Sequence, residues 1–125
     1  MKLFSKAADG GKGSGVTGYF LIEWKRAFSI VLLHFAKGTR EAFHEHAFNA
    51  WTLWLWGVVV EHHLNGYRKV FSGGMSKFTP RNCFHKIEAL EPTWALSIRG
   101  PWMDRWREWR QGRFVTLTHG RREVA

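Results

Sequence analysis

Three histidines at two places in the chain have the residue type and the spacing for metal chemistry. His44 and His46 enclose Glu45, and His85 lies farther along the chain. On a β-strand, residues i and i+2 point to one face, so His44 and His46 present their imidazoles side by side while Glu45 faces the other way. Neutral imidazole is a preferred ligand of divalent transition metals. The pair alone is a weak signal, because two histidines one residue apart are common by chance, and it gains weight from its context.

A second polar cluster, Glu61, His62 and His63, lies in the apolar segment 58–64. Strand alternation places His62 on one face and Glu61 with His63 on the opposite face. The apolar neighbours of His62 on its face favour an inward position, where it serves as a hydrogen-bonding pocket residue or as a buried histidine with a local partner. We therefore expect His62 to face the pocket.

Short extended segments must position these side chains. Residues 19–24 and 28–35 are rich in β-branched and aromatic residues and are separated by a charged turn, which is typical of paired strands. Segments of the same kind follow at residues 42–55, 58–67, 69–71, 77–78, 84–89 and 93–99. Glycine, proline and asparagine break the chain between them, and few segments show the apolar period of a helix. The pattern predicts an all-β sandwich or barrel.

The C-terminal aromatic segment allows two interpretations. In residues 101–111, tryptophans recur at i, i+4 and i+7 from Trp102, and a proline stands near the start, which favours a helix. An extended course over residues 106–116 is as plausible, because the residues after Gly112 alternate in polarity and Gly112 itself suits a turn. Both interpretations stay open at this point.

Composition indicates one folded domain. The chain has 125 residues, of which 45% are hydrophobic and 16% aromatic, too apolar for extensive disorder and too short for a second core. We expect residues 1–17, which contain a cluster of glycines, to form a flexible leader and residues 18–125 to form the single domain. No apolar stretch approaches the ~20 residues of a membrane-spanning helix, no secretory signal is evident, and Cys83 is the only cysteine. These features predict a cytoplasmic protein without membrane association.

The charge balance points to anionic partners. Nineteen Lys and Arg against ten Asp and Glu give a formal net charge of +9. The C-terminal quarter interleaves arginine with tryptophan, as nucleic-acid surfaces do and as a solvated edge with arginine stems over aromatic rings also does. No helix-turn-helix, zinc-finger or RNA-recognition motif accompanies it. Nucleic acid is therefore the minority hypothesis, and a small anionic ligand is expected.

Around the histidines, the chain resembles the two-motif signature of the cupin superfamily. The matching positions are Gly38, His44, His46, Ala50 and Gly57 in the first motif, and Gly74, Pro80, Asn82 and His85 in the second. Residues 19–112 are also similar to small single-domain cupins of uncharacterised function from bacteria and phages. The resemblance implies a double-stranded β-helix, that is, a cupin or jelly-roll barrel. It also implies that His44, His46 and His85 converge on a divalent transition metal, which would be Fe, Zn, Ni or Cu.

The chain departs from the cupin signature at Ala50, where an acidic ligand is expected, and at Ala89, where asparagine is usual. The implied centre therefore has three nitrogen ligands and no carboxylate, a combination that favours an anionic substrate. A metal-free pocket, in which the histidines only form hydrogen bonds, is the alternative.

Two functional hypotheses follow from the resemblance. The first is a metal-binding small cupin whose barrel pocket acts on an anionic small molecule, through dioxygenase-type or isomerase-type chemistry. The second is a non-catalytic module, of phage origin, that captures a nucleotide, a sugar or a signalling metabolite. Under both, His62, Trp54 and Arg99 are the expected ligand-contacting residues. We also expect a homodimer, because the chain has more aromatic side chains than one small core can absorb.

Overall fold

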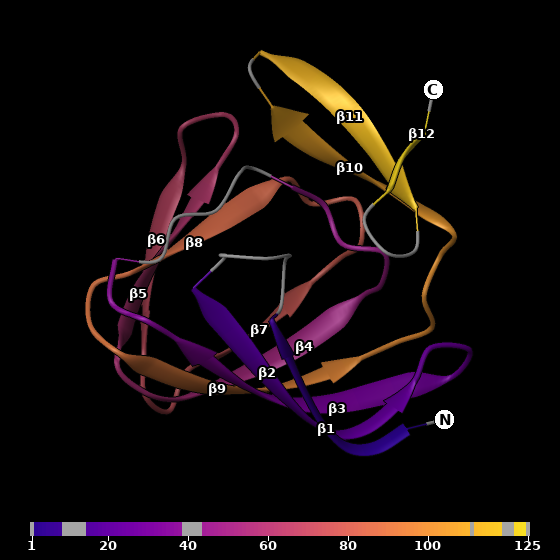
Figure 1. Ribbon diagram of the computed structural model, residues 1–125. Coiled ribbons are helices and arrows are strands. Elements are labelled where there is room, and N and C mark those ends of the chain that lie inside the picture. Colours follow the sequence, from indigo (N-terminus) through magenta and orange to yellow (C-terminus); the bar gives the residue numbers. More distant parts are fainter. Residues whose placement is uncertain (1, 9–14, 39–43, 111, 119–121, 125) are drawn as a thin grey trace.

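The computed structural model describes residues 2–8, 15–38, 44–110, 112–118 and 122–124, and every regular element in these ranges is a β-strand (Figure 1). The strands are β1 (Lys2–Ala8), β2 (Val16–Trp24), β3 (Phe28–Phe35), β4 (Ala50–Trp56), β5 (Val58–His63), β6 (Arg68–Ser72), β7 (Ser76–Thr79), β8 (His85–Ala89), β9 (Thr93–Arg99), β10 (Arg105–Arg110), β11 (Arg113–Thr118) and β12 (Arg122–Val124). The same ranges hold no helix with the length and apolar character that a bilayer crossing requires. The expected all-β class is confirmed.

The strands form one large and two small sheets. The six-stranded sheet has the order β1-β2-β3-β9-β4-β7, and the small sheets have the orders β6-β5-β8 and β10-β11-β12. His44 links the two small sheets, because its backbone forms isolated bridges with His85 at the start of β8 and with Glu108 in β10. In Figure 1 the strands surround a common interior, with the large sheet at the bottom, β5, β6 and β8 at the left, and β10 with β11 at the upper right.

Alternating burial along the strands builds two apolar clusters. In β3 every second residue from Ser29 to Phe35 is buried, as a strand with one face toward a core requires. The larger cluster comprises Val16, Phe20, Val31, Leu33, Phe35, Trp54, Val59, Phe71, Ile87, Ala89 and Ala95. The smaller cluster joins β10 and β11 to the start of β4 and comprises Ala47, Phe48, Ala50, Trp106, Val115 and Leu117. Residues of both clusters line one cavity together with His44, His46 and His85.

The C-terminal aromatic segment is extended. Trp106 and Glu108 in β10 are buried while the arginines next to them are exposed, which is the two-residue alternation of a strand. Gly112 has a φ of +79° in the turn to β11, a conformation that glycine adopts without strain. The helical interpretation of residues 101–111 is therefore wrong, and the extended interpretation is confirmed.

The N-terminal segment contributes a strand that the sequence did not suggest. β1 pairs antiparallel with β2 along most of its length. The expected flexible leader of residues 1–17 is thus incorrect for Lys2–Ala8 and for the start of β2 at Val16, and residues 9–14 lie outside the described ranges. The hydrogen-bonding edge of β2 explains the difference, because an edge strand is stabilised when another strand covers it.

The outer face of the six-stranded sheet carries an unbroken apolar row. Successive cross-strand partners in this row, one from each strand, are Leu3, Ile22, Ile30, Ile98, Trp51 and Phe78. A second row, over β2, β3, β9 and β4, consists of Tyr19, Leu32, Leu96 and Leu53. Trp51 is 39% exposed, Ile98 42% and Phe78 62%. We call the residues of these two rows the outer apolar face; none of them is charged.

Candidate metal centre

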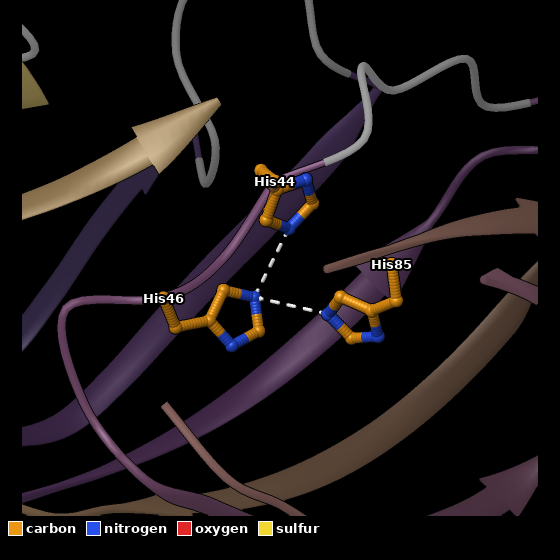
Figure 2. A group of neighbouring side chains, drawn as sticks. All are labelled: His44, His46 and His85. Carbon is orange, nitrogen blue, oxygen red and sulfur yellow. Dashed lines mark hydrogen bonds between the residues drawn. The ribbon is translucent and has the colours of Figure 1, made fainter. Parts of the chain in front are cut away.

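Three imidazoles from two segments converge inside the barrel. His44 and His46 lie in the connection between β3 and β4, and His85 begins β8. Reciprocal backbone hydrogen bonds of 3.0 Å join His44 to His85. The Nε2 atom of His46 lies 3.1 Å from Nε2 of His44 and 3.4 Å from Nε2 of His85. Figure 2 shows the three rings turning these nitrogens toward a common centre, and one ligand atom of each residue lies within 4.8 Å of the others.

This donor set fits a divalent transition metal. Zinc–nitrogen bonds of about 2.0–2.1 Å place two nitrogens of a tetrahedral ion about 3.3 Å apart, close to the two separations around His46. Metal binding also requires unprotonated nitrogens. Burial lowers the pKa of His46 and of His85 well below the usual value, and the neighbouring His44 acts in the same direction. Both imidazoles are therefore neutral at pH 7 and can serve as ligands.

The segment that carries His44 and His46 is fixed from its other side by β10. The buried Glu45 accepts hydrogen bonds from the backbone N–H of Arg107 at 3.0 Å and from its Nε at 3.1 Å. The backbone N–H of Glu45 donates in turn to the carbonyl of Arg107 at 2.9 Å. Glu45 thus faces away from the two imidazoles, as alternation predicts, although residues 45–47 are not in a strand.

Behind His85 lies Glu61 of β5, a carboxylate that is only 3% exposed. Its Oε2 atom lies 2.6 Å from Nδ1 of His85, and its Oε1 atom lies 2.9 Å from Nε2 of His63. Lys77 of β7 forms an ion pair with Oε2. An ionised carboxylate only accepts hydrogen bonds, so both imidazoles donate an N–H to it. With its proton on Nδ1, neutral His85 keeps a lone pair on Nε2, which faces the other two histidines.

His62 occupies the opposite face of β5. Its Nε2 atom lies 2.9 Å from Oε1 of Glu88, whose side chain is 51% exposed. His62 is not among the residues that line the cavity beside the histidines, so the expectation that it faces the pocket is wrong. Alternation correctly placed Glu61 with His63. The choice of face failed because Glu61 is compensated in the interior by side chains from β7 and β8.

The three histidines open on a cavity with a free volume of about 50 Å³. Its other polar lining residues are Thr52, Lys77, Thr79, Ser97 and Arg99. Its apolar walls are Leu33, Phe35, Phe48, Ala50, Trp54 and Ile87. Two of the three expected ligand-contacting residues, Trp54 and Arg99, therefore lie in the lining. Their contact with a ligand stays a prediction.

Arg99 and Trp54 differ in what they offer to the cavity. Arg99 is 4% exposed, and its guanidinium carbon lies 4.7 Å from the ring centre of Phe48. It brings a permanent positive charge to the lining. Trp54 is 3% exposed and packs against Phe35 and Phe71, with ring centroids 5.6 and 5.8 Å apart. Trp54 is thus a closely packed wall of the cavity and not an open stacking surface.

Solved structures of other proteins follow the same chain path. The structure is similar to an RmlC-like cupin from Shewanella frigidimarina, with a TM-score of 0.62 and 21% sequence identity over 73% of this chain and 80% of that chain. KdgF from Halomonas sp. matches with a TM-score of 0.63 and 19% identity over 75% of this chain and 87% of that chain. Ectoine synthase from P. lautus matches with a TM-score of 0.65 and 15% identity over 74% of this chain and 69% of that chain. The sequence matched no family model and no curated protein.

Proposed function

This chain has the double-stranded β-helix fold of the cupins, and we propose that it binds a divalent transition metal and acts on a small anionic molecule. The observation that carries the proposal is the convergence of three imidazoles, His44, His46 and His85, in a cavity that also holds Arg99 and Lys77. When bound, the metal would supply Lewis acidity at its open coordination positions, and iron would add dioxygen chemistry. Similar structures that are enzymes by name, ectoine synthase and DMSP lyases, support a catalytic use of this fold.

The charges around the centre favour an anionic ligand. The lining residues include Arg99 and Lys77 but no carboxylate, since Ala50 occupies the position of the acidic residue in the cupin signature. Burial lowers the pKa of Lys77 to about 8, which leaves the ammonium form dominant at pH 7. Positive side chains beside a dication bound by neutral ligands attract a carboxylate or another oxyanion.

The size of the cavity favours a small ligand. A water molecule needs about 10–15 Å³ by this measure of free volume, so the cavity holds roughly three to five waters. A small carboxylate or an inorganic oxyanion fits that space. A nucleotide or a sugar, the ligands of the second hypothesis, has many more non-hydrogen atoms. The volume therefore supports the first hypothesis over capture of a large metabolite.

Elemental analysis of the purified protein tests the metal. Protein purified without chelator, or stripped and reloaded, should contain about one equivalent of iron, zinc, nickel or copper per chain. His46→Ala should abolish this binding, whereas His62→Ala changes a histidine outside the cavity and should leave it intact. Less than about a tenth of an equivalent in the wild type, with none gained on reconstitution, would overturn the proposal.

Titration of the metal-loaded protein with formate, acetate and phosphate tests the ligand class. Arg99→Gln should weaken binding of the preferred anion by about tenfold or more, because a charge-assisted hydrogen bond is lost. Arg105→Gln, on the exposed side of β10, is the control and should bind the anion as the wild type does. Native mass spectrometry of protein as isolated from cells gives the opposing outcome. A retained nucleotide or sugar without metal would support the capture hypothesis instead.

A further inference from the structure

We propose that Glu61 is a positioning residue of the metal centre, and that through His85 it supplies the carboxylate that the cavity lining lacks at Ala50. This inference rests on the proposed function, because it assigns Glu61 a role toward the metal bound by the histidines. Glu61 lies in β5, between the two sequence motifs, so no position of the cupin signature predicts it.

The geometry separates Glu61 from a direct ligand. Its Oε2 atom contacts Nδ1 of His85 at 2.6 Å, on the side of the ring that faces away from His44 and His46. Glu61 is not among the lining residues of the cavity. A metal-bound histidine commonly donates its second N–H to a carboxylate, which fixes the tautomer and the ring orientation and makes the ligand more basic. Glu61 stands in that relation to His85.

The carboxylate itself is held firmly. Its Oε1 atom accepts a hydrogen bond from His63, and its Oε2 atom lies between His85 and Lys77. Both oxygens are therefore engaged, and the side chain has little rotational freedom. Lys77 also lines the cavity, so one ammonium group both pairs with the carboxylate of Glu61 and contributes to the positive charge of the lining. Glu61 thereby supplies the negative charge that is absent at Ala50, at a position separated from the other two histidines by the ring of His85.

Two substitutions at Glu61 separate its charge from its hydrogen bond. Glu61→Leu removes both, while Glu61→Gln keeps a carbonyl oxygen that can accept from Nδ1 of His85 but removes the charge. Competition with a chromophoric chelator measures the metal affinity, which should fall about 10- to 100-fold in Glu61→Leu and less in Glu61→Gln. Glu88→Leu, which breaks the matched glutamate–histidine pair on the outer side of β5, is the control and should bind metal as the wild type does.

A second measurement is made on the metal-free protein. Nitrogen-15 NMR should show His85 as the tautomer protonated at Nδ1 in the wild type and in Glu61→Gln, and as a mixture in Glu61→Leu. Thermal unfolding confirms that each variant is folded. If Glu61→Leu does not fold, the comparison is made with Glu61→Gln alone. Unchanged metal affinity in the folded variants would overturn the role of Glu61 and leave the proposed function standing. A wild type that binds no metal would overturn both, whereas a wild-type His85 protonated at Nε2 would overturn only the role of Glu61.

Discussion

Ala50 lies where a carboxylate would offset the positive charge of a metal held by the three histidines. It lines the cavity, is 4% exposed and lies opposite Arg99 in the sheet. Ala50→Glu should place a carboxylate beside the imidazoles, which increases metal affinity and weakens anion binding because the charge of the ion is offset. The increase in melting temperature on metal loading should therefore be larger than in the wild type. Ala50→Gln has the same size without the charge, and an increase as large as that of Ala50→Glu would contradict the argument.

Proton uptake should destabilise the metal-free protein in mild acid. Burial lowers the pKa of His46 and of His85 in the folded state, whereas in the unfolded chain both titrate near the usual value of about 6.5. Below about pH 6.5 the unfolded chain binds more protons than the folded chain, so the free energy of unfolding falls as the pH is lowered. Urea unfolding of chelator-treated protein across this range measures the effect. His46→Leu should show a shallower dependence, and a wild-type stability independent of pH would refute the prediction.

The residues of the centre differ in how far the sequence could predict them. His44, His46 and His85 could be found because their spacings to glycines and a proline match the cupin signature. Glu61 could not, because its burial depends on Lys77 and His85, which come from other strands. The apolar neighbours of His62 pointed to the wrong face of β5. The useful signal for the burial of Glu61 was His63, which lies two residues away on the same face of the strand and can donate a hydrogen bond to the carboxylate.

Among the elements, the segment 44–48 connects β8 and β10, through the backbone bridges of His44 and the hydrogen bonds of Glu45. Glu45→Ala should lower the free energy of unfolding by about 1–3 kcal/mol, because it removes charge-assisted hydrogen bonds and leaves the backbone N–H of Arg107 without its acceptor. Glu123→Ala removes an exposed pair with Arg113 at 3.7 Å and should cost less than about 0.5 kcal/mol. Urea unfolding compares the two. Equal decreases in the free energy of unfolding would show that Glu45 does not hold the segment 44–48 against β10.

Runs of β-branched and aromatic residues between glycine, proline and asparagine breaks were enough to predict most strands, including β3, β5 and β9. They were not enough in the C-terminal segment, because tryptophans at helical spacing also fit a strand when only some of them point inward. Trp106 is buried against the smaller core cluster, and Arg107 lies 5.0 Å from the ring centre of Phe84. Pairing with β11 and contact with residues 47–50 decide the conformation, and these long-range partners leave no local mark in the sequence. The packed rings favour the solvated-edge interpretation over a surface that stacks bases.

For the whole molecule, the outer apolar face bears on assembly, and we propose that it joins two copies of this chain. Strand spacing and residue spacing give its ten residues a flat footprint of about 330 Å² before side-chain relief is counted, roughly half of the ~600 Å² per partner of small specific interfaces, so a dimer contact would also include residues around this face. Its residues carry no charge, whereas the chain as a whole has a net charge of +9. Two copies that meet through this face therefore bring little charge into contact, apart from Lys6, whose Nζ atom lies 5.5 Å from the ring centre of Tyr19 at one edge of the face.

Sedimentation tests the dimer. The wild type should sediment at about twice the chain mass of 14.6 kDa at tens of micromolar, and Trp51→Lys or Phe78→Lys should shift it toward the monomer, because each places an ammonium group in an apolar contact. Tyr67→Lys changes an aromatic residue that is 59% exposed outside this face, and the dimer should persist. A wild type that is monomeric at these concentrations would contradict the proposal.

His44 forms backbone bridges to both β8 and β10, so the segment that carries His44 and His46 connects the two small sheets. We expect that a metal that orders the imidazoles also raises the free energy of local opening of β10, because His44 is bridged to Glu108 in that strand. Hydrogen–deuterium exchange should register this as stronger protection of the Arg107 amide after metal loading, with the amides of β6 unaffected. Because coupling between two sites is reciprocal, a change that loosens the hairpin of β10 and β11 should lower the affinity of the three histidines for a metal.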